Sequence, residues 1–359
     1  MTSSHGRGLL HLAAALDQPT AYDAGSYVEA ARLAERGGLD FVTLDDSFAR
    51  PGPDALAVLS RVAPATRRLG LVPTVTTTHT EPFHVQAAVA TLDWVSRGRA
   101  GWRIEVSPTE GEARLFGRRH AAAADALWQE AGEVADVAAK LWDSWEDGAE
   151  IRDVATGRFV DRDKLHHVDF TGSAFSVKGP SIVPRPPQGH PVRVVDATEG
   201  HARSTAARYA DVALVRATNP AQAAAVRDEL RLRAAESGRD PDGLRVLASL
   251  LVDLGGGEHA AEPGHGGGGP RQTAQGPLYR GGPVDLAELI ATWHQDGAVD
   301  GFHFTPVEPS RDLERLVNGT VALLQHRGLF RTFYPGSTLR EHLGLGRPAN
   351  QYAVTGGAS

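Results

Sequence analysis

Short apolar runs alternate with longer amphipathic segments along almost the whole chain, a pattern typical of parallel strands joined by helices. The apolar runs predict eight strands, at Leu9–Ala15, Asp40–Leu44, Leu69–Val75, Ala100–Val106, Val192–Asp196, Asp211–Arg216, Leu244–Val252 and Asp300–Phe304. The amphipathic segments predict eight helices, at Ser26–Arg36, Asp54–Thr66, Phe83–Val95, Asp125–Trp142, His201–Tyr209, Pro220–Ser237, Asp285–Gln295 and Leu313–His326. This count predicts an α/β protein with a closed (β/α)8 TIM barrel.

The stretch Leu69–Val106 is one such unit, with a strand, a crossover helix and a second strand. Polar residues end both strands, with the run Thr76–His79 on the first and Arg103 and Glu105 on the second. Because parallel-sheet proteins carry their chemistry at the carboxyl ends of strands, we expect the functional site at this rim. An open doubly wound sheet would instead show a glycine fingerprint after its first strand, and the sequence has none there.

The alternation predicts a single domain over residues 1–359, long enough to bury one large core. Two segments interrupt it. Residues 143–190 are rich in proline, glycine and charge, and we interpret them as an insertion before the fifth strand. Residues 255–283 contain the run GGGEHAAEPGHGGGGP, and we interpret them as a shortened, flexible loop after the seventh strand.

Composition narrows the class of protein. The net charge is −7 with interspersed signs, which argues against a nucleic-acid or anionic-membrane surface. There is no cysteine, so disulfides, thiolate metal sites and cysteine nucleophiles are excluded. The N-terminal apolar run is shorter than a membrane span and lacks the flanks of a signal peptide. We therefore expect a cytoplasmic protein that binds neither nucleic acid nor membrane.

Polar residues near the ends of the predicted strands form the candidate site. They are His11, Asp45, Asp46, Thr74, Thr76, Thr78, His79, Arg103, Glu105, Asp196, Thr198, Glu199, Arg216 and His303. So many polar groups at one end of a barrel are unfavourable unless they bind a ligand or pair densely with one another. The sequence has no serine-hydrolase elbow, Walker loop or HExxH helix, which removes three common chemistries.

Several of these residues also have a structural interpretation. A lone His11 or His303 is more often a hydrogen-bonded core histidine than a catalytic one. Asp46 is of a residue type that caps helices, and Arg103 with Glu105 is compatible with an ion pair between layers of the barrel. A metal site that joins these two histidines to Glu105 and Asp196 is conceivable in composition alone, and we assign no metal ligand.

Longer motifs point to a family. The chain resembles the bacterial-luciferase-like flavin monooxygenases, in the branch of nitrilotriacetate monooxygenase, dibenzothiophene-sulfone monooxygenase and the pristinamycin synthase flavoprotein. The matching segments include ARLAERGGLDFVTLDDS, TTTHTEPFHVQAAVATLDWVSRGRAGW, LWDSWEDGA, FSVKGPSIVPRPPQGHPV and GLFRTFYPGSTLREHLGLGRPAN. The resemblance implies a (β/α)8 barrel, commonly a homodimer, that uses O₂ and reduced FMN from a separate flavin reductase to oxygenate a small organic substrate.

The resemblance also implies which residues bind the cofactor. Asp46 matches the family's aspartate after the second strand, near the flavin. Thr76 and Thr78 match the hydroxyl cluster that ends the third strand. The family's histidine and tyrosine before the fourth helix are Ala124 and Trp128 here, so Trp128 takes the tyrosine's place in the predicted cofactor site.

Other positions depart from the family pattern. Arg103 replaces the family's asparagine, and Glu105 replaces an apolar residue close by. We assign both, together with His11 and His79, to the catalytic set, with the two histidines as the groups expected to contact the substrate.

The phosphate loop departs furthest. Where the family has Gln-Ala-Gly-Ser-Ser, this chain has Val195-Asp196-Ala197-Thr198-Glu199. The family's small residues let backbone N–H groups hold a phosphate. Here Glu199 is expected to satisfy those N–H groups itself, and each acid would repel the phosphate by roughly 4 kcal/mol at an effective dielectric of about 20. Thr198 and Glu199 complete the predicted cofactor site.

Three functions stay open at the level of sequence. The first is a two-component FMN-dependent monooxygenase with an atypical phosphate loop. The second is a flavin-independent enzyme on the same barrel, either cofactor-free or metal-assisted. The third is a non-catalytic homologue that acts as a binding subunit.

Overall fold

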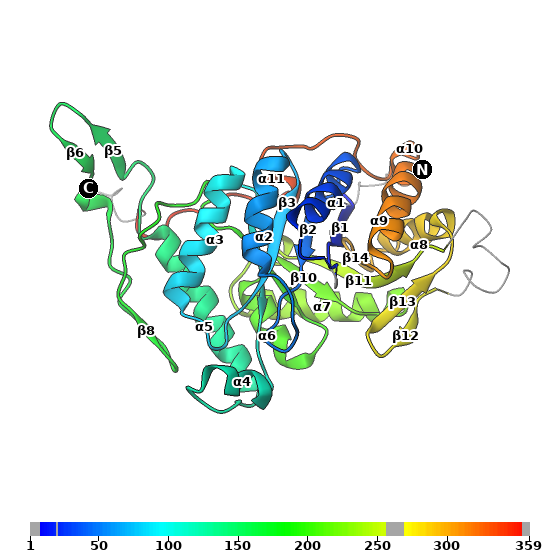
Figure 1. Cartoon of the computed structure of the whole chain (residues 1–359), viewed down its shortest axis with the longest axis horizontal. Helices are drawn as coiled ribbons and strands as arrows, with labels where there is room; N and C mark the ends of the chain where they lie inside the picture. Colours follow the sequence, from blue (N-terminus) through cyan, green and yellow to red (C-terminus); the bar gives the residue numbers. More distant parts are fainter. Residues whose placement is uncertain (1–7, 19–20, 256–268, 354–359) are drawn as a thin grey trace.

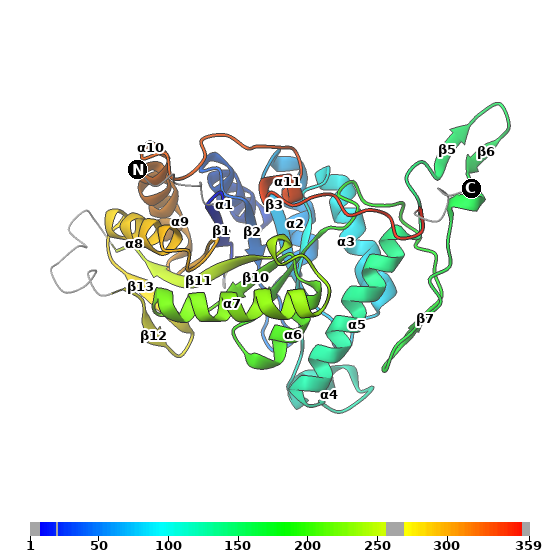
Figure 2. The same ribbon diagram turned by 180° about the vertical axis from the view of Figure 1, so that it is seen from behind.

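The computed structural model describes residues 8–18, 21–255 and 269–353, which form a barrel with a projecting arm (Figures 1 and 2). Its strands are β1 His11–Ala15, β2 Phe41–Leu44, β3 Gly70–Thr76, β4 Gly101–Glu105, β5 Glu150–Asp153, β6 Arg158–Val160, β7 Phe170–Thr171, β8 Ser176–Val177, β9 Val192–Asp196, β10 Val212–Val215, β11 Arg245–Asp253, β12 Arg271–Thr273, β13 Gly276–Arg280 and β14 Gly301–Pro306. Its α-helices are α1 Ala24–Arg36, α2 Ala55–Val62, α3 Pro82–Ser96, α4 Glu110–Phe116, α5 Ala124–Asp143, α6 Gly200–Tyr209, α7 Pro220–Glu236, α8 Pro283–Gln295, α9 Pro309–Arg315, α10 Ala322–His326 and α11 Leu339–His342.

Eight parallel strands close into a barrel. Their order is β10-β9-β4-β3-β2-β1-β14-β11, and β10 also pairs with β11. The first and last strands of the barrel also pair with each other. His11 of β1 pairs with Gly301 of β14, and Ala14 pairs with Phe304. The eight predicted strands are all present and helices surround them, so the prediction of a TIM barrel is confirmed. The last predicted helix is divided into α9, a π-helical stretch at Leu316–Val321 and α10.

Local sequence sets the ends of the helices. The carboxylate of Asp23 accepts hydrogen bonds from the N–H groups of Gly25 and Ser26 and so caps α1. Helix α3 ends where Arg97 takes a left-handed conformation, with φ of 60°. The next arginine, Arg99, turns inward and donates to the carbonyl oxygen of Leu69 at 2.7 Å. This turn sets the start of β4 beside β3.

The segment 255–283 differs from its prediction. β12 and β13 form an antiparallel hairpin, and β13 also runs parallel to the second half of β11, where Leu278 pairs with Leu251. The hairpin corrects the prediction of a flexible loop over residues 269–283, and residues 256–268 lie outside the described part. The strands are only three and five residues long, too short for their periodicity to stand out beside a glycine-rich run.

The predicted insertion at residues 143–190 forms the arm. Two short hairpins, β5–β6 and β7–β8, leave the barrel after α5 and project from it on the side away from the β12–β13 hairpin (Figure 1). Arg185 ties the base of the arm down, because its guanidinium donates to Asp143 at 3.1 Å and to Asp147 at 2.7 Å. These contacts join the base of the arm to the end of α5.

The amino ends of the strands are closed by α11. Apolar side chains fill the lumen and form one cluster with the segment around this helix: Ala13, Phe41, Val72, Val192, Val194, Val212, Leu214, Leu247, Leu339, Leu343 and Leu345. Gly70 makes room for the helix, since a Cβ at this position would lie 2.6 Å from Leu339 Cδ1. Arg340 fixes the helix by donating to buried Asp211 at 3.2 Å. Helix α11 and the lumen side chains thus form one packed apolar layer at the amino ends of the strands.

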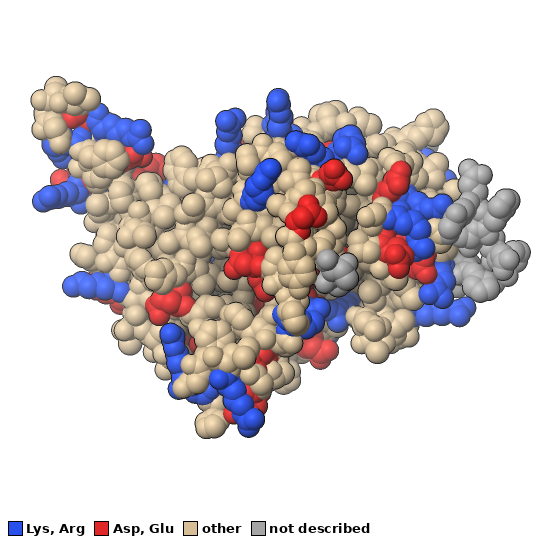
Figure 3. Space-filling view, viewed as in Figure 1, with Lys and Arg blue, Asp and Glu red and all other residues tan. Residues whose placement is uncertain are grey.

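Both signs of charge occur together on the surface. Figure 3 shows Lys and Arg side chains interspersed with Asp and Glu over the face in view. Some opposite charges pair directly, as Arg119 and Glu130 do at 2.7 Å. Within the described ranges, no helix is both long enough and apolar enough to cross a membrane.

Removing the plug residue is expected to destabilise the barrel. Leu339 is fully buried in the lumen, so Leu339→Ala should lower the free energy of unfolding by about 2–5 kcal/mol through lost burial and a residual cavity. Leu232, which is 62% exposed on α7, is the matched control, and Leu232→Ala should stay within about 0.5 kcal/mol of the parent. Urea unfolding measures both changes. Equal, small changes would contradict the role of the plug.

Candidate active site

Charged side chains form a network at the carboxyl ends of the strands. Arg103 on β4 lies 3.7 Å from Asp45 after β2 and 3.6 Å from Glu105 on its own strand. Arg216 after β10 pairs with Asp196 at the end of β9, 3.2 Å away. The network borders a cavity of about 220 Å³, which is lined by polar residues that include Asp17, Asp45, Arg50, Arg103, Arg216, Ser249, Gln275 and His303. We call this space the polar cavity.

Burial sets the protonation of this network. Burial opposes the charge of Arg103, but Glu105 and Asp45 outweigh it and raise the pKa of the guanidinium, which stays charged. Burial raises the pKa of Glu105, and Arg103 offsets only part of that effect. Burial also raises the pKa of Asp17, even though Asp17 accepts a hydrogen bond from the N–H of Asp45 at 2.8 Å. Glu105 and Asp17 are therefore easier to protonate than surface acids.

His303 forms part of the wall of the polar cavity and is held neutral. Its Nε2 lies 2.8 Å from the hydroxyl of Thr43, and its Nδ1 lies 3.3 Å from the hydroxyl of Ser249. Burial, with a smaller contribution from Arg103, lowers its pKa to about 3. His303 is therefore a hydrogen-bonded core histidine at neutral pH, which was one of its two interpretations from the sequence.

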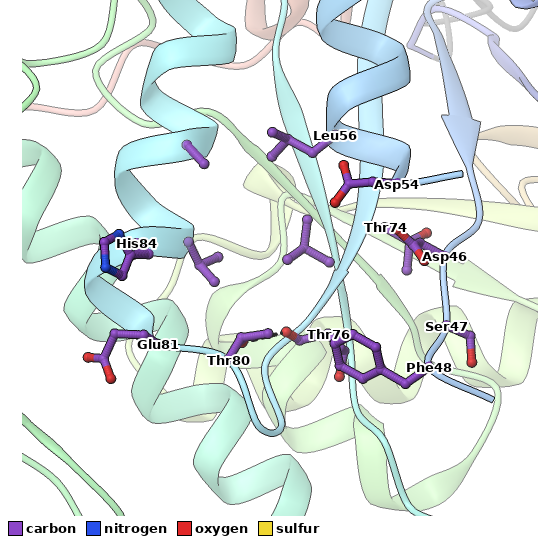
Figure 4. A pocket seen from close by; sticks show the side chains of 13 residues that line it. Asp46, Ser47, Phe48, Asp54, Leu56, Thr74, Thr76, Thr80, Glu81 and His84 are labelled. Atoms are coloured by element: carbon purple, nitrogen blue, oxygen red, sulfur yellow. Dashed lines mark hydrogen bonds between the residues drawn. The ribbon is translucent and has the colours of Figure 1, made fainter. Parts of the chain in front are cut away.

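A second cavity lies at the carboxyl end of β3, next to helices α2 and α3 and to the loop that follows β2 (Figure 4). Its volume is about 270 Å³, and apolar residues from α2, β3 and α3 make up most of its wall, including Leu56, Val75, Val85 and Ala88. Asp46, Thr74 and Thr76 add polar groups at its edge. We call it the apolar cavity, and it brings together Asp46 and Thr76, two of the residues predicted to bind the cofactor.

Thr74 carries an unsatisfied polar atom in the wall of the apolar cavity. The residue is 1% exposed, and its Oγ1 has no hydrogen-bond partner among the described residues. The neighbouring carboxylate of Asp46 accepts from the N–H of Ala55 at 2.9 Å, and burial raises its pKa. Because buried hydroxyls are normally hydrogen-bonded, the free Thr74 hydroxyl indicates a place for a ligand atom or an ordered water.

The remaining threonines of this strand end are tied to β4. Thr76 Oγ1 lies 3.0 Å from Ser107 Oγ, and Thr78 Oγ1 accepts from the N–H of Ser107 at 3.1 Å. Thr76 lines the apolar cavity. Thr78 does not line it and instead holds the loop after β3 through its bond to Ser107. Of the two predicted threonines, Thr76 is thus the one with direct access to a ligand.

His79 lies in the same loop in a strained conformation. Its φ is 67°, which is uncommon for a residue with a side chain. Its ring stacks on Phe116 with centroids 4.9 Å apart, and Phe116 in turn contacts Phe48 edge to face at 4.7 Å. Neither ring nitrogen has a partner in the described chain, and burial lowers its pKa. His79 joins three loops of the rim and stays a candidate for ligand contact.

His11 is not at the rim. It is the first residue of β1 and pairs with the first residue of β14, so it lies at the amino ends of the strands. Its Nδ1 lies 3.2 Å from buried Asp40, which Arg331 also contacts at 2.7 Å. The prediction that His11 belongs to the rim is wrong. His11 stands at the start of the first strand, whereas rim residues stand at the ends of strands.

Two cofactor-site predictions also change. Trp128 is buried in an apolar cluster with residues of α5 and α6, and its carbonyl oxygen accepts from the hydroxyl of Thr205 at 2.8 Å. Glu199 stands at the start of α6 but is exposed, and its side chain makes no capping hydrogen bond there. The prediction that Glu199 satisfies the helix N–H groups is therefore wrong. Thr198 donates its own N–H to Asp196 at 3.0 Å.

The four residues of the conceivable metal set do not meet, because His11 lies at the opposite end of the barrel from Asp196. Across the described ranges, no cluster of three or more histidine and acidic residues has the geometry of a metal site. Sequence reasoning missed Asp17 and Gln275, which both line the polar cavity. Asp17 was predictable, because it follows the first strand just as the other candidate residues follow theirs. Gln275 was not, because it lies in the hairpin that the sequence did not predict.

Known proteins match the chain over most of its length. The family model described as luciferase-like monooxygenase matches residues 7–297. The chain belongs to the luciferase-like monooxygenase family. N-acetyl-S-(2-succino)cysteine monooxygenase of Bacillus subtilis (strain 168) is 31% identical over 401 residues, which cover 91% of each protein. Nitrilotriacetate monooxygenase component A of Aminobacter aminovorans is 32% identical over 418 residues, which cover 93% of this chain and 92% of that protein.

Solved structures agree on the fold. EDTA monooxygenase from Chelativorans sp. BNC1 superposes with a TM-score of 0.82 at 22% identity, and the match covers 96% of this chain and all of that chain (100%). At this identity the likeness concerns the barrel alone. The family to which the sequence motifs pointed is thereby confirmed, while the atypical residues of the rim belong to this chain.

The neutral state of His303 predicts a pH dependence of stability. Its pKa in the folded chain, about 3, is below the ordinary value near 6.5, so its contribution to stability is present above pH 6.5 and is lost as pH falls toward 3. From pH 7 to pH 5 the loss from this group is about 2 kcal/mol. His303→Gln should lower the pH dependence of the unfolding free energy by that amount in urea titrations. An unchanged difference between the two pH values would show that His303 titrates normally.

Proposed function

We propose that the chain is a flavin-dependent monooxygenase that holds the isoalloxazine ring of a reduced flavin in the apolar cavity at the rim. The observation that carries this proposal is the buried hydroxyl of Thr74, which lacks a partner in the described chain and belongs to a residue that lines a cavity with largely apolar walls. An isoalloxazine ring has apolar faces and a polar edge, and the cavity offers both environments. Membership of the luciferase-like family supports the same assignment.

The polar groups at the edge of the cavity suit such a ring. Thr74 and Thr76 offer hydroxyls, and the carboxylate of Asp46 is available as an acceptor. The volume of about 270 Å³ lies near the lower limit of ligand pockets, roughly 300 Å³, so it suits the ring and leaves the side chain of a flavin outside. Leu56 and Val85 exclude water from the faces of the ring, as oxygen chemistry on a reduced cofactor requires.

The two cavities lie on either side of one short segment. Asp45 borders the polar cavity, and the next residue, Asp46, borders the apolar one. A substrate in the polar cavity would therefore lie next to the ring. There, Arg103 would orient an anionic or carbonyl group through its charged guanidinium, and Glu105 and Asp17 would orient a cationic or hydroxyl group.

When bound, the reduced flavin supplies the activation of O₂, and the chain supplies binding, orientation and exclusion of water. His79, whose two ring nitrogens have no partner among the described residues, is the residue proposed to contact the substrate beyond the charged network. A separate flavin reductase would deliver the cofactor, and a homodimer is the proposed assembly. The substrate is proposed to be a small organic molecule.

Filling the apolar cavity should abolish flavin binding. Ala88 lines the cavity from α3, so Ala88→Phe is expected to weaken binding of the reduced flavin at least about tenfold, which corresponds to about 1.4 kcal/mol. Ala235→Phe, at an exposed position of α7, is the control for adding the same side chain. Anaerobic calorimetric titration measures the dissociation constants. If Ala88→Phe binds as tightly as Ala235→Phe, the ring does not occupy this cavity.

A further inference from the structure

The guanidinium of Arg103 is buried but poorly hydrogen-bonded. Its side chain is 13% exposed, and its Nε has no hydrogen-bond partner among the described residues. The carboxylates that face its other two nitrogens, those of Asp45 and Glu105, lie 3.7 and 3.6 Å away, which is beyond hydrogen-bond distance. A guanidinium carries five N–H donors, and a buried donor without an acceptor is unfavourable. Arg103, which lines the polar cavity, therefore has donors available for a ligand there.

The carboxylates around the polar cavity are better satisfied. Each of the four accepts at least one hydrogen bond, Asp45 from the guanidinium of Arg50, and Asp17, Glu105 and Asp196 from backbone N–H groups. The unmet hydrogen-bonding capacity of the network therefore lies mainly with a donor, and the ligand that fits it supplies acceptors.

The charges that line the cavity agree with this conclusion. The network as a whole has four carboxylates and the three guanidinium groups of Arg50, Arg103 and Arg216. Only two of the carboxylates, those of Asp17 and Asp45, belong to residues that line the cavity, whereas all three arginines line it. Burial also raises the pKa of Asp17, which makes this carboxylate easier to neutralise. The wall of the cavity thus carries a surplus of positive charge.

Strand register places Arg103 beside the apolar cavity. Arg103 on β4 and Thr74 on β3 are partners in the parallel ladder, and neighbouring strands lie about 4.8 Å apart. Thr74 lines the apolar cavity, and Arg103 lines the polar one. A group held by Arg103 would therefore lie one strand away from the hydroxyl that is proposed to meet the flavin ring.

We infer that the substrate is a small carboxylic acid whose carboxylate binds to Arg103. The inference rests on the proposed function, because it assumes that the flavin ring occupies the apolar cavity. A carboxylate presents two acceptor oxygens in one plane, which match the parallel N–H groups of a guanidinium. The cavity volume of about 220 Å³ is below the usual range of ligand pockets, which begins at roughly 300 Å³, so it suits an acid of few carbon atoms.

The test compares three four-carbon compounds that differ in their polar group: butyrate, butyramide and butylamine. Each is titrated against the wild-type chain without flavin, by ligand-observed NMR. Butyrate is expected to bind at least about tenfold more tightly than the other two. Equal binding of butyramide, tighter binding of butylamine, or no butyrate binding up to about 50 mM would overturn the inference.

Substitutions assign the binding to Arg103. Arg103→Gln should weaken butyrate binding about tenfold or more and remove its advantage over butyramide. Arg103→Lys keeps the charge but loses the planar pair of donors, so its affinity should be intermediate. It keeps the test available if Arg103→Gln fails to fold.

The matched control is Arg193→Gln. Arg193 is 12% exposed, lies 3.6 Å from Asp211, and also has a buried Nε without a partner in the described chain, but it does not line the polar cavity. Arg193→Gln should leave butyrate binding unchanged. Equal losses in the Arg103 and Arg193 variants would overturn the inference.

Flavin titrations separate this inference from the proposed function. Arg103 does not line the apolar cavity, so Arg103→Gln should change the affinity for reduced flavin by less than about twofold. If the wild-type chain binds flavin but not butyrate, the inference fails and the proposed function stands. If it binds butyrate but no flavin at high micromolar concentration, the proposed function fails and the carboxylate site at Arg103 stands.

Discussion

The pairing of β1 with β14 is the constraint on which the site depends. These strands lie at the two ends of the barrel sequence, and their hydrogen bonds bring Asp17, which follows β1, to the same cavity as His303 on β14. With α11 packed against the lumen at the amino ends, the polar cavity lies at the carboxyl ends of the strands. A parallel barrel collects strand ends from the whole sequence in one ring, which is how short polar segments far apart in the chain become one site.

Neighbouring residues of the rim line two cavities of different polarity. Charged groups gather around the polar cavity, where Arg103 stays ionised and burial makes Glu105 easier to protonate. The apolar cavity has walls of Leu56, Val75, Val85 and Ala88, and among the described residues the hydroxyl of Thr74 beside it lacks a partner. An apolar ring and a polar substrate require these two environments side by side.

Sequence periodicity predicted the barrel because each strand is a continuous apolar run bounded by polar residues. It failed for the β12–β13 hairpin, whose strands are too short to show a period. The rim residues Asp46 and Thr76 were predictable, since residues after parallel strands share one edge. His11 was assigned to the wrong end because sequence does not show where in its run a strand begins. The contacts of Glu199 and Trp128 depend on side-chain direction, which only the packed structure determines.

The central claim is that the flavin ring occupies the space bordered by Asp46, Thr74 and Thr76. A crystal structure of the chain with a bound flavin tests it most directly. The account predicts electron density for the three-ring system between β3 and α3, with a polar atom of the ring within hydrogen-bond distance of Thr74 Oγ1. Density for the ring inside the polar cavity, in contact with Arg103 and His303, would contradict the account.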